Sequence, residues 1–239
     1  MPIKIITAPG DTAGKNILKS GNNYNTVHDA TAGTNAGNAD TKFTLNAKAG
    51  SNYFIRRGIL IYDFRETAAT RAIPKHIKIF RAQLIVNDVS ELAPQTGGDK
   101  VRVAWLFNPK TFGDFHANDY DKSRYAASTY TSPQQLNNGA DGEIINLNNR
   151  RLLNQLEKAI NNRTYLHLVI RNELDYQDTQ ATGNNRAWFG RPNADNNPMQ
   201  LRVFYGIRAS RKHNQGGRRP SRSGFQGSNV CSGTSSGFN

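Results

Sequence analysis

The sequence predicts an all-β protein: an antiparallel β-sandwich of jelly-roll type, with one short helix and a flexible basic C-terminal tail. Three observations favour this fold class. Five or more segments show the two-residue apolar period that is typical of strands. The chain is rich in Asn and contains 21 glycines in 239 residues, a composition that suits long turns. One segment has the spacing of an amphipathic helix.

The first 50 residues are expected to be the loop-rich part of a sandwich domain that spans residues 1–206. Residues 3–7 read IKIIT, which predicts a short strand before the turn at Pro9 and Gly10. Residues 11–50 are dominated by Gly, Asn, Thr and Ala, with few bulky apolar side chains. This low hydrophobicity predicts extended loops and short edge strands.

The centre of the chain is rich in predicted strands. Ile59 and Ile61 share one strand face, and Leu60 and Tyr62 share the other. We therefore expect a strand that is buried on both sides, or one that packs one apolar face against a partner. The same alternation continues in four later segments: Ala82, Leu84, Val86; Val101, Val103, Trp105; Leu166, Leu168, Ile170; Met199, Leu201, Val203, Tyr205. His167 alternates with its neighbours, so it is expected to face away from them and to be exposed.

The one predicted helix spans residues 149–162. Leu152, Leu153, Leu156 and Ile160 recur at helical spacing, and Asn148 or Asn149 could supply the N-cap. On this helix Glu157 and Lys158 are expected to face solvent. A further single turn of helix is expected around residues 120–125.

One stretch of sequence resembles a known family. In residues 53–89 an apolar strand ends in Asp63-Phe64, an Ile73-Pro74 step follows, and the next strand carries Ala82 and Leu84. This order resembles the signature of DNRLRE-type β-sandwich domains, and the AWFGRP and LRVFY segments near residues 187–206 add to the likeness. The resemblance implies a non-enzymatic binding or building module, because such sandwiches occur in secreted carbohydrate-binding proteins and, as similar small sandwiches, in bacteriophage virion proteins. It also places Trp188 in the core.

Composition and motifs exclude several classes of function. Cys231 is the single cysteine, so an intramolecular disulfide or a Cys-based zinc site cannot form. The sequence shows no export signal and no apolar run that could span a membrane, so a cytoplasmic place of assembly and no membrane partner are expected. No nucleophile elbow, P-loop or paired-histidine motif is present, which predicts a protein that is not an enzyme.

Two acidic loops are candidate calcium sites, because calcium binds several carboxylate oxygens from loops. Neither loop has the EF-hand pattern, so solvated acids are the favoured interpretation, no cofactor is expected, and a structural calcium is the alternative. The acidic residues are Asp114, Asp119 and Asp121 in one loop and Glu173, Asp175 and Asp178 in the other.

The segment between residues 107 and 142 is aromatic and polar, with weak periodicity. It is expected to be an ordered surface loop whose aromatic side chains offer a surface to a carbohydrate or a protein partner, with Tyr120 and Tyr125 the preferred candidates. The full candidate set is Phe112, Phe115, Tyr120, Tyr125 and Tyr130.

The last 33 residues, 207–239, differ sharply from the rest. They contain six basic and no acidic residues, and so contribute +6 of the net charge of +13. Their Gly, Ser, Arg and Asn content predicts a flexible tail that becomes ordered on a neighbouring subunit, binds a polyanion such as nucleic acid without sequence specificity, or has no partner. The basic residues are Arg208, Arg211, Lys212, Arg218, Arg219 and Arg222.

These observations lead to one functional hypothesis and two alternatives. The first is a structural protein of a tailed-bacteriophage virion, such as a capsid decoration, head-fibre or tail-attachment subunit, which packs against neighbouring subunits as a homo-oligomer and is assembled in the host cytoplasm. The near absence of cysteine, the missing export signal and the arm-like ends favour it. The alternatives are a carbohydrate-binding module and a nucleic-acid-associated protein that binds through the tail.

Overall fold

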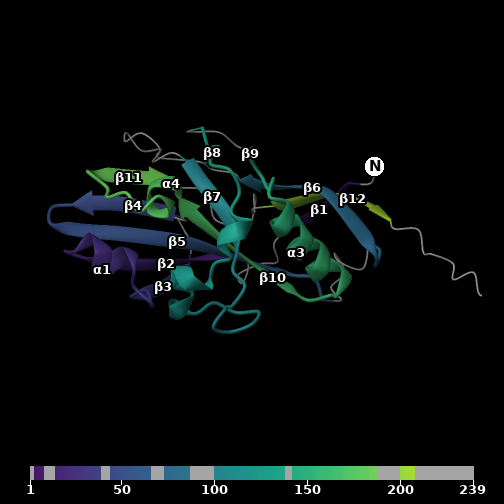
Figure 1. The fold of residues 1–239 in the computed structure, drawn as a ribbon, viewed down its shortest axis with the longest axis horizontal. Helices are drawn as coiled ribbons and strands as arrows, with labels where there is room; N and C mark the ends of the chain where they lie inside the picture. The colour runs from purple at the N-terminus through teal and green to yellow at the C-terminus, as the bar shows by residue number, and fades with distance from the viewer. Residues whose placement is uncertain are drawn as a thin grey trace, which may run out of the picture. The chain divides into compact units, whose positions relative to one another are not determined.

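The computed structural model describes residues 3–7, 14–38, 44–65, 73–86, 100–137, 142–187 and 200–207. The chain divides into two compact units, Met1–Arg208 and Ala209–Asn239, and every described residue belongs to the first. Within this unit the described strands form two antiparallel sheets with few helices (Figure 1). The prediction of an all-β antiparallel sandwich is therefore confirmed.

The smaller sheet has four strands in the order β1-β12-β6-β9. Every neighbouring pair is antiparallel, and a β-bulge between Phe204 and Tyr205 shifts the register of the β12–β6 pair. The strands are β1 (Ile3–Thr7), β6 (Ile77–Val86), β9 (Glu143–Asn146) and β12 (Gln200–Ile207). The chain thus brings its first strand beside its last, which only tertiary structure could decide.

The larger sheet is organised around β5 (Asn52–Asp63), the longest strand. Its main order is β11-β4-β5-β10-β7-β8, and β2 pairs with β3 and with the opposite edge of β5. The other strands are β2 (Gly14–Gly21), β3 (Asn35–Asn38), β4 (Thr44–Ala49), β7 (Lys100–Trp105), β8 (Gln134–Gln135), β10 (Tyr165–Asn172) and β11 (Asn184–Ala187).

Both faces of β5 are buried, as its doubly apolar pattern predicts. Leu60 and Tyr62 belong to the main core, which also contains buried residues of β6, β7, β10 and β12. Ile59 and Ile61 belong to a second core on the other face. That face is covered by α1 (Tyr24–His28) and by the segment after β7, which contributes Tyr120 and Tyr125. The larger sheet is therefore a middle layer rather than an outer wall.

The predicted helix is α3 (Arg150–Asn161), with Asn149 as its N-cap. The side-chain oxygen of Asn149 accepts hydrogen bonds from the backbone N–H groups of Arg151 and Leu152, as an N-cap residue does. The expectation that Glu157 faces solvent is wrong: its carboxylate is buried and accepts the backbone N–H of Ile79 at 3.0 Å. Burial of this acid becomes favourable because β6 supplies that donor and Lys78 a counter-charge.

Short helical segments add to this framework. The sequence predicted one helix and one further turn, whereas the described residues also form the α-helices α1 and α4 (Glu173–Tyr176). In and around the range 120–125, where the single turn was expected, they form three 3-10 turns: η2 (Ala117–Tyr120), η3 (Lys122–Arg124) and η4 (Ala127–Thr129). In the part of the chain that is described, no helix has both the length and the apolar character needed to cross a membrane.

Candidate functional site

The aromatic surface expected between residues 107 and 142 does not form as predicted. Tyr120 and Tyr125 are buried in the second core, so the expectation that they face a ligand is wrong. Their hydroxyl groups donate to backbone carbonyls, Tyr120 to Val27 at 2.9 Å and Tyr125 to Asp119 at 2.7 Å. A tyrosine can be buried at little cost when its hydroxyl finds such a partner, and polar surroundings in the sequence do not reveal this.

The other three aromatic candidates are separated from one another. Phe115 and Tyr130 are half-buried against the second core. The hydroxyl of Tyr130 accepts a hydrogen bond from Arg171 at 3.0 Å, and its ring meets Tyr176 edge-on. Phe112 is 61% exposed and so remains available to a ligand. Of the five predicted residues, Phe112 alone therefore has a ring that is mostly exposed.

Beside these tyrosines lies a buried ionic cluster that the sequence analysis missed. Arg57 is fully buried, and its guanidinium binds the Asp175 carboxylate through two hydrogen bonds of 3.0 and 2.8 Å. Arg171 donates to the same carboxylate at 2.7 Å. The ring of His28 lies 2.9 Å from the backbone oxygen of Asp175. The sequence feature that could have indicated this cluster is the pair of arginines at positions 56–57, within a strand of mostly apolar residues.

The electrostatics of this cluster indicate a structural role. Burial by itself would raise the pKa of Asp175, but the guanidinium groups of Arg171 and Arg57 hold it well below its usual range. Arg57 also lies over the Tyr120 ring, 4.1 Å from its centroid, and donates to the Tyr120 carbonyl. Because the cluster is sealed from solvent and its polar groups are used internally, it holds β5, β10 and the covering layer together.

The acidic side chains that are candidate calcium ligands bind other groups of the protein. Asp119 accepts the backbone N–H groups of Lys110 and His116, and Asp121 caps η3. Glu173 pairs with Arg102, and Asp175 belongs to the arginine cluster. Among the described residues, no group of three or more His, Cys, Asp or Glu side chains could hold a metal ion. Neither loop therefore supports the calcium alternative.

A surface cavity lies between α3 and the strand end at Trp105. It consists of two adjoining hollows, one of about 400 Å³ and one of about 240 Å³, which share Trp105, Gln155 and Lys158. We call them together the Trp105 groove. Most residues that line the larger hollow have polar side chains, whereas the smaller includes the rings of Trp105, Phe107, Phe112, Tyr165 and His167. The larger is lined by Lys78, Trp105, Ala126, Ser128, Thr129, Arg151, Asn154, Gln155, Glu157 and Lys158.

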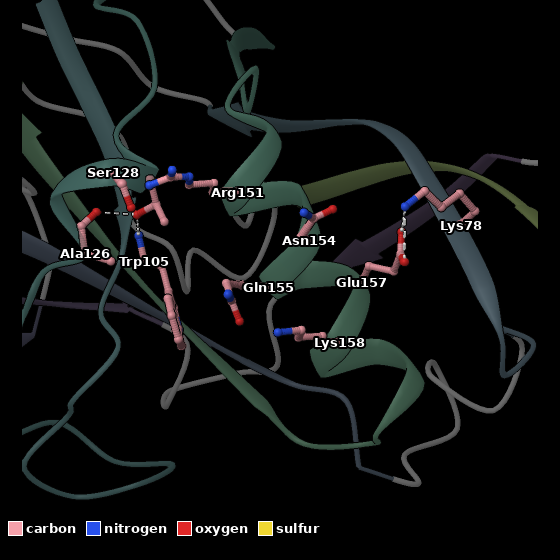
Figure 2. A pocket seen from close by; sticks show the side chains of 10 residues that line it. Lys78, Trp105, Ala126, Ser128, Arg151, Asn154, Gln155, Glu157 and Lys158 are labelled. Atoms are coloured by element: carbon pink, nitrogen blue, oxygen red, sulfur yellow. Dashed lines mark hydrogen bonds and ion pairs between the residues drawn. The ribbon is translucent and has the colours of Figure 1, made fainter.

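One face of α3 forms a wall of this groove. Arg151, Asn154, Gln155 and Lys158 follow the i, i+3, i+4, i+7 spacing that places side chains on one helix face. Figure 2 shows Gln155 and Lys158 pointing from α3 toward Trp105. Trp105 lies opposite this helix face. Its backbone N–H donates a hydrogen bond to the Thr129 hydroxyl at 2.9 Å, which fixes the strand end. The helix therefore presents an amide, Gln155, and a cation, Lys158, to the indole ring.

The aromatic hollow has two exposed rings at its mouth. Phe107 is 47% exposed and lies near Trp105, with ring centroids 6.0 Å apart. Phe112 stacks on His167 at 5.6 Å and meets Tyr165 edge-on at 5.3 Å. The rings beneath Phe112 support it, so its exposed face is a prepared contact surface.

His167 is buried under this loop, contrary to the expectation that it is exposed. It faces away from Leu166 and Leu168 as predicted, but Phe112 and Gly113 cover it. Its Nε2 atom accepts the backbone N–H of Gly113 at 3.0 Å, while the buried Nδ1 atom has no hydrogen-bond partner among the described residues. Burial lowers the pKa of His167 to about 4, and the Asp114 carboxylate only partly opposes this shift.

A second apolar surface lies on the smaller sheet. Phe80 is 51% exposed on β6, and its ring lies over Gly206 of β12, where an added Cβ would approach it to 3.0 Å. Ile207, the next residue of β12, is 64% exposed. The Arg81 guanidinium lies 5.4 Å from the centroid of the half-exposed Phe204 ring. We call Phe80 and Phe204 the Phe80 patch; Ile207 pairs with the buried Ile77 and so belongs to the other face of the sheet.

The remaining predicted residues lie outside the described part of the chain. These are Trp188, expected in the core, and the six basic residues of the tail: Arg208, Arg211, Lys212, Arg218, Arg219 and Arg222.

Two comparisons with known proteins found no match for this chain. No protein-family model matches the chain. No curated protein matches it either. The likeness to DNRLRE-type domains therefore remains a hypothesis based on the residues around Asp63 and Ile73.

Proposed function

We propose that this chain is a non-enzymatic structural protein of a tailed-bacteriophage virion, which acts by packing against neighbouring subunits. The observation that carries the proposal is the Phe80 patch. The ring of Phe80, which is 51% exposed, lies over Gly206, and the half-exposed Phe204 shares the same face of β12. Adjoining exposed apolar side chains on a soluble protein often mark a surface that a partner covers.

The basic tail supports the same proposal. It continues from β12, the strand that carries Phe204, so contacts made by the patch and by the tail could be linked on one partner. The DNRLRE-like sequence features add weight to a building module. The sandwich would supply a rigid body, and the tail would extend the contact area.

Light scattering on the purified chain tests this proposal. We expect a defined oligomer whose mass falls in Phe80→Ser, because a polar side chain at the patch centre weakens apolar burial. Phe112→Ser is the matched control, since Phe112 is equally exposed but lies in the Trp105 groove. A chain that ends at Arg208 reports the contribution of the tail.

Two results would contradict the proposal. One is a full-length chain that stays monomeric at concentrations of tens of micromolar. The other is an oligomer that Phe80→Ser and Phe112→Ser weaken equally, because the patch would then have no special part in assembly.

The carbohydrate-binding alternative has lost part of its basis. With Tyr120 and Tyr125 buried, the predicted sugar platform is reduced to Phe112. The Trp105 groove is the remaining place in the described structure where a sugar ring could meet exposed aromatic faces. A glycan array with wild type and Phe112→Ala tests this alternative, which requires recognition that the substitution abolishes.

A further inference from the structure

The Trp105 groove combines ring surfaces with positive charge. Phe107 and Phe112 expose their rings at its aromatic end, and Trp105 lies where the two hollows meet. Arg151 and Lys158 line the polar end. Among the described residues, neither cation makes an ion pair or a hydrogen bond. Both are exposed and therefore free to meet an anion.

The single carboxylate that lines the groove does not cancel this charge. Glu157 lies 3.3 Å from Lys78 and accepts the backbone N–H of Ile79, so its charge is balanced from β6. Figure 2 shows the Lys78–Glu157 pair on the opposite side of α3 from Trp105. The side chains that α3 directs at the ring are the amide of Gln155 and the ammonium group of Lys158. The rim beside Trp105 thus has a net positive charge.

We propose that the Trp105 groove binds single-stranded nucleic acid, with bases on the exposed rings and phosphates on Arg151 and Lys158. Accessible aromatic faces beside a row of cations are what unpaired strands require, because every base has a flat face and every linkage carries a negative charge. A neutral sugar would use the rings and the amides but would leave both cations without a partner. The net charge of +13 favours a polyanion in the same way.

This site differs from the polyanion-binding tail predicted from the sequence. It lies on the folded unit, it includes stacking as well as charge, and it does not depend on the assembly proposal. The contacts of Phe112 with His167 and Tyr165 lower the conformational entropy that the Phe112 side chain would lose when a base stacks on it.

Fluorescence anisotropy with a labelled oligo(dT) of about 12 nucleotides tests the proposal. To remove binding by the tail, the assay uses a full-length variant in which the six basic residues of the tail are replaced by Gln. In that background we expect Phe112→Ala to weaken binding about tenfold. We expect Lys158→Gln to reduce the slope of log K against log salt by about 0.7, the value for one phosphate contact.

Two substitutions outside the groove serve as matched controls. Ile144→Ala removes an exposed apolar side chain that belongs to neither the groove nor the Phe80 patch, and Lys75→Gln removes an exposed lysine. Both should leave the affinity and the salt slope unchanged. All four positions are exposed, so the substitutions leave the two cores intact.

Three results would overturn the proposal. The tail variant could fail to bind the oligonucleotide, which would restrict nucleic-acid contacts to the tail. The groove substitutions could have no more effect than the controls. The groove could instead bind a polyuronate or a neutral glycan more tightly than oligo(dT), with the same dependence on Phe112, which would favour the carbohydrate-binding alternative.

Discussion

Arg57 and Asp175 lie 118 residues apart in sequence and form a doubly hydrogen-bonded ion pair in the interior. Arg57 comes from the middle of β5, and Asp175 from α4, directly after β10. Arg171 donates to the same carboxylate, so one acid balances two buried guanidinium groups. The pair therefore joins the longest strand of the larger sheet to its neighbour and to the layer that covers it.

Replacing Asp175 with Asn should destabilise the protein strongly. The substitution leaves Arg57 and Arg171 buried without a counter-charge, for which we expect a loss of about 3–5 kcal/mol in the free energy of unfolding. Urea denaturation measures it. Asp63→Asn is the matched control, because Asp63 pairs with the exposed Arg65 and should cost less than about 1 kcal/mol. Equal losses at both positions would contradict the assignment of the cluster as a structural centre.

His167 should make stability depend on pH in mildly acidic solution. Its pKa is about 4 in the folded protein, against an ordinary value of 6.5. Between these values the unfolded chain binds a proton that the folded protein does not, so the free energy of unfolding falls as the pH drops through this window. The folded environment consists of Gly113, the Phe112 and Tyr165 rings, and the Asp114 carboxylate, which limits the shift.

The His167 effect should reach about 3 kcal/mol at pH 4, from the size of the pKa difference. Urea denaturation of wild type and His167→Gln at several pH values isolates it from other titrating groups. We expect the difference between the two proteins to change across the window and to level off above pH 7. A difference that is the same at pH 4 and pH 7 would show that the buried ring does not titrate as described.

Gly113 should not tolerate alanine. Its φ of +82° favours glycine, and an added Cβ would lie 2.6 Å from the Tyr165 ring. Gly142 is a matched control, with φ of +76° but no atom within 4 Å of an added Cβ. Both alanine variants carry the same kind of backbone strain, so the difference between them reports the contact with Tyr165. We expect Gly113→Ala to be less stable than Gly142→Ala by about 1–3 kcal/mol because of overpacking, as measured by thermal or urea unfolding. Equal losses would place the ring of Tyr165 outside the reach of residue 113.

Asn149 should contribute more than an ordinary helix cap. Its oxygen caps α3, and its amide group donates to the carbonyls of Ser128 and Tyr130. We expect Asn149→Ala to cost about 2 kcal/mol in urea denaturation, since it removes the cap and leaves two carbonyls without their donor. Asn23→Ala, at the cap of the five-residue helix α1, should cost about 1 kcal/mol. A smaller loss at Asn149 than at Asn23 would contradict this role.

The sequence predicted those parts of the structure that depend on local period. Alternation identified β5, β6, β7, β10 and β12, and helical spacing identified α3 together with its cap at Asn149. The polar face of α3 was also visible in Arg151 and Lys158, but nothing local indicated that Trp105 lies opposite. The site could not be predicted because its two walls are separated by tens of residues and are brought together by sheet pairing.

Burial of polar and aromatic side chains was the main error. Tyr120 and His167 each find a backbone partner in a distant segment, Val27 and Gly113, and Tyr125 finds one six residues away, at Asp119. A hydrogen bond to such a partner offsets the desolvation of a polar group, and only the folded chain shows whether the partner is present.

By its own periodicity and composition, the sequence determined an all-β sandwich with one amphipathic helix and a basic C-terminal segment. The tertiary structure decided which strands pair, that β5 is covered on both faces, and that Arg57 meets Asp175. The physical reason is that side-chain period is set within a few residues, whereas register, layering and the pairing of buried charges depend on long-range contacts.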